Sequence, residues 1–157
     1  MPLKGTQIPG ERLAFVAYKY GQIPVKELET CLAIGFGESN WYDKAYNFND
    51  TTGDRSFGIW QVNLLGKLKA QRMKDFQLTK EEDLYDLVTQ ARCMGIIYRE
   101  ALSWGRPSGW TPWGAYTNGS YAQHRALAQR GVTLFKQRLA ESGDRLHVGG
   151  ENDCDRI

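Results

Sequence analysis

The fold depends on one stretch, Ala33-Ile34-Gly35-Phe36-Gly37-Glu38-Ser39-Asn40, an apolar run that ends on a single acidic residue. Upstream of it, apolar side chains recur at helical spacing behind Pro24, a residue that is favoured in a first helical turn. The pattern predicts a helix from about Pro24 to Gly37, with Glu38 at its C-terminal end. Burial among apolar neighbours and the negative end of the helix dipole both oppose ionisation, so we expect Glu38 to keep a proton near neutral pH. Such a carboxyl can serve as a general acid.

Three further helices follow from the spacing of apolar residues. They cover residues 11–20, with a stop at Gly21, then about 85–104, and finally about 120–141. The segment Thr79-Lys80-Glu81-Glu82 has the form of a capping box, which predicts the start of another helical segment. The residues of the long helix that we expect to face inward are Leu87, Ala91, Met94, Ile97, Tyr98 and Leu102.

The segments between the helices are rich in turn-forming residues. Residues 39–55, with many Asn, Asp, Thr and Gly, indicate a loop or a small, irregular hairpin. We interpret residues 57–63 as a short helix and residues 103–119 as a loop rich in Gly, Pro and Trp. No internal repeat or linker interrupts the pattern, so the sequence predicts one mainly α domain, of the α+β kind, with a small hairpin.

Length and composition agree with one globular domain. A chain of 157 residues with a hydrophobic fraction of 41% can bury a core without disulfide or metal staples. We divide it into an N-terminal segment of residues 1–10, a helical domain of residues 11–141 and a polar tail of residues 142–157.

Charge and hydropathy bear on the partners of the chain. The net charge of +2 is modest and no recognition element is visible, so nucleic acid is not an expected partner. Residues 67–80 and 121–138 carry local excesses of Lys and Arg, which either attract an anionic polymer or form solvated helix faces. No apolar run has the length of a membrane span, and the N-terminus lacks the apolar core of a signal peptide. We therefore expect no stable membrane insertion, and synthesis in the cytoplasm without a signal peptide.

No cofactor or metal is expected. His124 and His147 lack metal-ligand spacing with each other or with a cysteine, and the chain has no glycine-rich phosphate-binding motif. Cys31 and Cys93 lie in apolar, helical surroundings, where a free cysteine behaves as a small hydrophobe, and Cys154 lies in the polar tail. This pattern favours a chain without disulfides, as in a reducing cytoplasm.

Three short motifs now point to a family. In chain order they read Glu38-Ser39, then Gly53-Asp54-Arg55 followed by Phe57-Gly58-Ile59-Trp60-Gln61-Val62, then Ala115-Tyr116-Thr117-Asn118-Gly119. Together they resemble the active-site region of goose-type lysozymes and soluble lytic transglycosylases, which belong to the lysozyme-like superfamily. The longer string from Trp113 to Tyr121 is similar to a form common in phage-encoded wall hydrolases. The resemblance spans about residues 11–140.

The resemblance implies roles for the acidic residues. Glu38 matches the family's general acid, which protonates the oxygen of a glycosidic bond. Asp54 matches an aspartate of goose-type enzymes that helps to position a water, a role that suits inversion; the alternative is a turn aspartate that bonds local backbone. The sequence also departs from the family, since a further aspartate of goose-type enzymes corresponds to Asn63. Ser56 stands where chicken-type lysozymes place their aspartate, and Asp50 is a third candidate by its place in the loop.

The same motifs supply candidate substrate-binding residues. The matching tyrosine of the family suggests that Tyr116 donates its hydroxyl to Glu38 or to a substrate acyl group. Gln61 and Asn118 offer amides for sugar hydroxyls or acetamido groups, and Ser56 offers a hydroxyl. Of the five tryptophans we expect at most two to line a cleft, Trp113 among them. Most tryptophans are largely buried, and Trp60 is the one that we expect in the core.

The function implied is cleavage of the β-1,4 bond between N-acetylmuramic acid and N-acetylglucosamine in peptidoglycan. Because Asp54 is present, we prefer hydrolysis by a muramidase over a lytic transglycosylase, which closes a 1,6-anhydro ring. The alternatives are a catalytically silent wall-binding or structural module of a phage tail or secretion apparatus, and chitin cleavage by the same fold. We expect a monomer that acts on the bacterial wall as a phage endolysin or a virion-associated enzyme.

Overall fold

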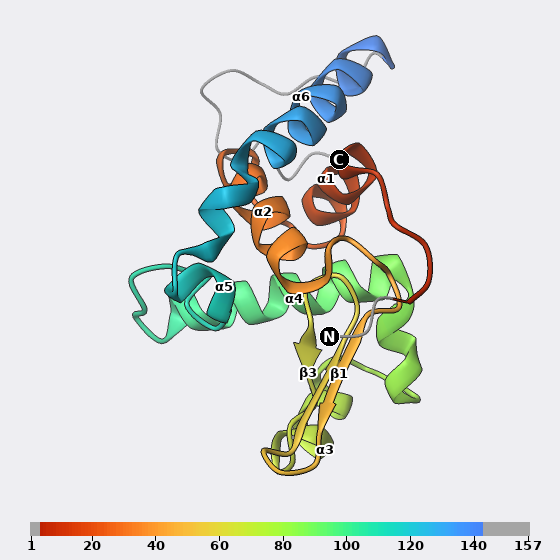
Figure 1. The fold of residues 1–157 in the computed structure, drawn as a ribbon, viewed down its shortest axis with the longest axis vertical. Helices are drawn as coiled ribbons and strands as arrows, with labels where there is room; N and C mark the ends of the chain where they lie inside the picture. The colour runs from red at the N-terminus through yellow and green to blue at the C-terminus, as the bar shows by residue number, and fades with distance from the viewer. Residues whose placement is uncertain (1–3, 143–157) are drawn as a thin grey trace.

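A computed structural model describes residues 4–142 of the chain. Helices α1, α2 and α6 gather on one side of the long helix α4, and a small sheet extends on the other side (Figure 1). This mainly α arrangement with a three-stranded antiparallel sheet confirms the predicted fold class. The elements in chain order are α1 (Gly10–Lys19), η1 (Val25–Glu27), α2 (Leu28–Ser39), β1 (Tyr46–Asn49), β2 (Asp54–Phe57), β3 (Val62–Asn63), α3 (Leu68–Asp75), η2 (Glu81–Tyr85), α4 (Leu87–Ser103), α5 (Gly114–Thr117), η3 (Ser120–His124) and α6 (Arg125–Glu141), where η marks a short 3-10 helix.

Helix α2 lies at the centre of the helical body. It packs against α1 and α6, and its residues from Cys31 to Gly35 are all buried. The predicted helix is confirmed, with a 3-10 turn after Pro24 as its first part. It ends at Ser39 because Asn40 takes a left-handed conformation (φ 52°) and its N–H closes the helix on the Phe36 carbonyl. Glu38 therefore lies in the last turn.

Helices α1 and α6 pack closely across two glycines. A Cβ placed on Gly131 of α6 would come within 2.8 Å of the backbone carbon of Gly10, at the start of α1. Only glycine allows the two backbones to approach this far. The first predicted helix, with its stop near Gly21, is confirmed to within one residue at each end.

The sheet forms the hairpin that the sequence left open. Strands β1 and β2 pair antiparallel, with Tyr46 opposite Phe57, and β3 adds a short third strand in which Asn63 lies opposite Ser56. The short helix predicted for residues 57–63 is wrong. A tight turn replaces it, in which Gly58 (φ 80°) and Gln61 (φ 50°) leave helical geometry so that the chain can pair back on β2.

Helix α4 is slightly shorter than predicted and buries one face. Ala91, Met94, Ile97 and Tyr98 are buried as expected, and Leu87 is partly buried. The prediction that Leu102 faces inward is wrong, since 45% of it is exposed. It lies in the last turn of α4, where its side chain is not covered by other residues.

The connections contain three local differences from the sequence prediction. Asp83, rather than Glu82, accepts the N–H groups of Thr79 and Lys80, and the segment that follows is the 3-10 helix η2. The predicted loop 103–119 includes the short helix α5, and the predicted last helix is divided into η3 and α6. Ser142 follows α6, and the rest of the predicted tail, including His147 and Cys154, lies outside the described residues.

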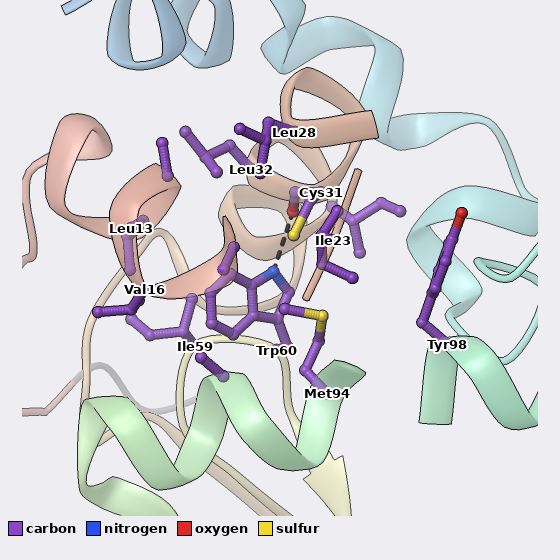
Figure 2. Packing of buried hydrophobic residues seen from close by; sticks show 14 of the residues in the cluster. Leu13, Val16, Ile23, Leu28, Cys31, Leu32, Ile59, Trp60, Met94 and Tyr98 are labelled. Carbon is purple, nitrogen blue, oxygen red and sulfur yellow. Dashed lines mark hydrogen bonds between the residues drawn. The ribbon is translucent and has the colours of Figure 1, made fainter. Parts of the chain in front are cut away.

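The core is one cluster of buried residues that joins α1, α2, α4 and α6 to the sheet, and Met73 of α3 and Tyr116 of α5 pack against it. Trp60 is fully buried in it, and Figure 2 shows Cys31, Ile59 and Met94 next to its ring. Cys31 and Cys93 are buried and free, as expected. Among the helices of residues 4–142, none combines the length and the apolar character that crossing a bilayer requires.

Buried Gln90 of α4 links this helix to the turn that carries Trp60. Its Oε1 accepts the Trp60 backbone N–H (2.9 Å), and its Nε2 donates to the carbonyls of Phe57 (3.0 Å) and Leu84 (2.7 Å). These three bonds satisfy backbone groups that water cannot reach.

We expect Gln90→Met to reduce the free energy of unfolding by about 2–5 kcal/mol, because it leaves buried backbone groups without partners. Methionine keeps the helix propensity and the approximate shape of glutamine, so the loss reports the hydrogen bonds. Urea unfolding at pH 7 measures it. The control is Gln129→Met on the exposed face of α6, expected to stay within about 0.5 kcal/mol of wild type. Equal stability of the two variants would contradict the role given to Gln90.

Candidate active site

A cleft of about 550 Å³ lies between the sheet, the end of α2, helix α3 and the loop before α5. Five of the residues singled out from the sequence line it: Glu38, Asp54, Ser56, Gln61 and Trp113. A second hollow of about 590 Å³, between α1 and α6, is lined by four apolar and four polar or charged residues and contains none of them. The chemistry predicted from the sequence therefore gathers in the polar cleft.

Glu38 is partly buried in the last turn of α2 and faces this cleft. One of its oxygens accepts the backbone N–H of Ala115 in α5 (3.2 Å). Burial raises the pKa of Glu38 above its ordinary value, and the hydrogen bond from Ala115 lowers it by less. The direction agrees with a carboxyl that holds its proton, and burial is the main cause.

Asp54, at the start of β2, is held by two neighbouring side chains. Its Oδ1 accepts from Nδ2 of Asn63 (3.0 Å), and its Oδ2 accepts from the hydroxyl of Thr52 (2.7 Å). Asn63, which cannot act as a base, is itself fixed because its Oδ1 accepts the backbone N–H of Arg55 (3.1 Å). The cleft thus holds two carboxyls in different environments, one buried at a helix end and one oriented by neutral donors.

The role of a turn residue belongs to Asn49 rather than to Asp54. Oδ1 of Asn49 accepts the backbone N–H groups of Thr51 and Thr52 and so closes the hairpin turn. Asp50 is exposed in that turn and does not line the cleft.

Gln61 and Ser56 present oxygens to the cleft. The side-chain amide of Gln61 donates to the carbonyls of Ala45 (3.2 Å) and Gly58 (2.9 Å), which orients it. No hydrogen bond within residues 4–142 reaches Oε1 of Gln61 or the hydroxyl of Ser56. No buried side-chain oxygen or nitrogen in this part of the chain lacks a partner, so both oxygens lie on the accessible wall of the cleft.

The third motif, residues 115–119, contacts Glu38 through a backbone N–H and not through a side chain. Tyr116 does not line the cleft, and its ring lies 5.2 Å from the ring of Tyr121. In the described part of the chain its hydroxyl makes no hydrogen bond to Glu38; the contact comes from the N–H of Ala115 next to it. Asn118 also lies outside the cleft, where its Oδ1 accepts the N–H of Ser120 (2.8 Å).

The tryptophans divide into one exposed ring and four buried ones. Trp104 is 66% exposed, and the others are 5% exposed or less, with each indole N–H donating to a partner. Trp60 belongs to the core, as expected, and Trp113 is the one tryptophan that lines the cleft.

Arg72 of α3 lines the cleft and was not singled out from the sequence. It is partly buried, its Nη1 donates to the Asn63 carbonyl (2.6 Å), and burial lowers its pKa. In sequence it is one of several cations in residues 67–80. Arg72 follows Leu68 by four residues, so both lie on one face of a helix, and both line the cleft. This spacing was the available signal, but it does not show which face of the helix meets the cleft, and Leu68 itself is exposed.

Within residues 4–142, no group of three or more His, Cys, Asp and Glu side chains could hold a metal ion. His124 instead packs against the ring of Phe36, with 4.8 Å between the ring centres.

Comparisons of the chain with protein-family models, curated proteins and solved structures find no match. The lysozyme-like resemblance therefore rests on the three motifs and on the cleft in which two of them place their side chains.

The raised pKa of Glu38 predicts how stability depends on pH. The folded chain holds this proton more tightly than the unfolded chain, so the linkage stabilises the fold below the ordinary carboxyl pKa of 4.5. That stabilisation is lost as pH rises through the raised pKa. Glu38→Gln, which cannot ionise, should therefore gain stability relative to wild type as pH rises from acid to neutral. Urea unfolding across this range measures the difference.

The control for this experiment is Glu141→Gln, at the exposed end of α6, whose stability should follow wild type across the same range. A stability difference between Glu38→Gln and wild type that stays constant with pH would contradict the assignment.

Proposed function

We propose that this chain is a lysozyme-like glycosidase that cleaves the β-1,4 bond between N-acetylmuramic acid and N-acetylglucosamine in bacterial peptidoglycan. One observation carries the proposal: Glu38, whose pKa burial raises, and Asp54, held by neutral donors, line the same open cleft. Pairs of carboxyls in contrasting environments are the usual machinery for glycoside hydrolysis.

In the proposed reaction a glycan strand lies in the cleft with the bond to be cut beside Glu38. Glu38 gives its proton to the leaving oxygen while positive charge develops at the anomeric carbon. A water adds its oxygen to that carbon and gives a proton to Asp54. The products are a new reducing end and a free hydroxyl, and proton exchange with solvent restores both carboxyls.

Asp54 keeps the capacity to bind this water. Each of its oxygens accepts one hydrogen bond, and a carboxylate oxygen has two lone pairs. Asn63 and Thr52 fix the direction of the carboxylate, so the remaining lone pairs point in a constant direction. This supports hydrolysis over transglycosylation, in which the sugar's own hydroxyl attacks and no second carboxylate is required.

Three of the predicted substrate-binding residues line the cleft, which supports the roles we propose for them. The free oxygens of Gln61 and Ser56 would accept hydrogen bonds from sugar hydroxyl or amide groups, and Trp113 would contribute apolar surface. For Tyr116 and Asn118, which lie outside the cleft, a substrate contact stays a prediction from the resemblance. The action as a phage endolysin or virion-associated enzyme and the monomeric state also stay predictions.

Glu38→Gln should lower the rate of wall cleavage by about 10²- to 10⁴-fold, the usual contribution of a general acid. Clearing of a peptidoglycan suspension measures the rate, with Glu141→Gln as the control that should retain full activity. A fully active Glu38→Gln would remove the general acid from the proposal.

Wild-type protein that pulls down with insoluble wall but does not clear it would favour the silent wall-binding module, and activity restricted to chitin oligomers would favour a chitinase.

Asp54→Asn separates the two chemistries. If Asp54 activates water, the variant should lose about 10²-fold or more in rate, while Asp50→Asn in the adjacent turn should keep wild-type activity. Mass spectrometry of the wild-type products should show reducing ends. Anhydro-muramic ends together with an active Asp54→Asn would show that the enzyme is a transglycosylase.

A further inference from the structure

Among the cations of residues 4–142, Arg72 stands out because it lines the candidate cleft and has no carboxylate within ion-pair distance. It lies on the same face of α3 as Leu68, one turn away, and both side chains reach the cleft wall. Its guanidinium makes one hydrogen bond, to the Asn63 carbonyl, and lies 5.8 Å from the ring of Phe76. No carboxylate within residues 4–142 comes within ion-pair distance of it.

Five other arginines of residues 4–142 have structural partners. Arg55, Arg125 and Arg138 pair with Glu81, Glu29 and Glu11. Arg92 and Arg99 donate to backbone carbonyls, as Arg72 does, but neither lines the cleft. The position of Arg72 on the cleft wall is therefore not accounted for by folding alone.

Burial of a guanidinium without a nearby counter-ion costs free energy, because the group stays protonated and loses part of its hydration. Burial is the largest cause of the lowered pKa of Arg72, and the more distant charge of Glu100 raises this pKa by less than burial lowers it. A guanidinium has five N–H donors, and one is used here, so several remain for a ligand. The ligand that offsets this cost best is a carboxylate, which accepts two parallel N–H groups of the planar fork.

We propose that Arg72 binds a carboxylate carried by the N-acetylmuramic acid unit, and so sets which sugar of the strand occupies which part of the cleft. The inference rests on the proposed function and adds the ligand group that the cleft recognises. The carboxylate belongs either to the free lactyl group of a peptide-free strand or to the attached stem peptide. Both present the same chemistry to the guanidinium.

Asn63 connects this binding site to the carboxylates. Its side chain donates to Asp54, and its backbone carbonyl accepts from Arg72. One residue of β3 thus positions both the base and the cation. A strand bound by its acidic sugar would then lie in a constant register relative to Asp54 and Glu38, which a neutral strand of N-acetylglucosamine would not.

The test measures binding in a Glu38→Gln background, where turnover is suppressed. Isothermal titration calorimetry is carried out with three tetrasaccharides: a peptide-free strand with free lactyl carboxylates, a strand that carries stem peptides, and chitotetraose, which has no carboxylate. Arg72→Gln should weaken binding of an acidic strand by about 10- to 100-fold, the range for a hydrogen-bonded charge, and change chitotetraose binding by less than about twofold.

The arms also identify the source of the carboxylate. A loss on the peptide-free strand assigns the lactyl group, and a loss on the peptide-bearing strand alone assigns the stem. The matched control is Lys74→Gln, which removes the same charge from the exposed face of α3 without touching the cleft. It should leave all three affinities within about threefold.

A structural role would give a different result. If Arg72 only supports Asn63, Arg72→Gln weakens chitotetraose as much as the acidic strands, and the inference is overturned while the proposed function stands. Equal affinities of Arg72→Gln and its parent for all ligands would overturn it as well. Absence of binding by every glycan would overturn the inference and the proposed function together.

A second variant covers the case in which Arg72→Gln fails to fold, which its melting temperature would reveal. Arg72→Lys keeps the charge and a donor for the Asn63 carbonyl but loses the planar fork. It should bind chitotetraose normally and the acidic strand several-fold more weakly. Normal binding of both would contradict recognition of a carboxylate by the fork.

Discussion

The cleft depends on the hydrogen bonds of one buried residue, Trp60. Its indole N–H donates to the Cys31 carbonyl of α2, its backbone N–H donates to Gln90 of α4, and its carbonyl accepts the indole N–H of Trp113 (Figure 2 shows the first). These three partners belong to the first turn of α2, to the long helix α4 and to the loop before α5. Because the ring is fully buried, the cleft walls cannot shift relative to one another without opening the core.

The contrast between the two carboxyls has a structural origin in the elements that carry them. Glu38 ends an apolar helix, so packing of that helix removes water from its carboxyl and raises its pKa. Asp54 begins a strand of a hairpin, where the side chains of Thr52 and Asn63 reach it across the turn and from the neighbouring strand. A helix end and a strand thus supply two protonation environments within one small domain.

The sequence predicts the helices well because their signal is local. Apolar residues repeat along each helix at the spacing that buries one face, and this places α1, α4 and the end of α2 with Glu38 within two residues. The start of the second predicted helix is the 3-10 turn η1, and α2 itself begins at Leu28. The same local signal fails at residues 57–63, where apolar residues suggest a helix but pairing with β2 decides. It also fails at Leu102, because periodicity does not tell how far the covering layer extends.

The sequence by itself determined the order of the main helices α1, α2, α4 and α6 and placed an acid at the end of an apolar helix. Only the tertiary structure decided which side chains share a cleft. It brought Arg72 to the cleft wall, left Tyr116 and Asn118 outside it, and linked Asn63 to both Asp54 and Arg72. The physical reason is range: helical spacing is set by neighbours three or four residues apart, whereas the cleft collects residues from Glu38 to Gly114 and exists only once the core has packed around Trp60.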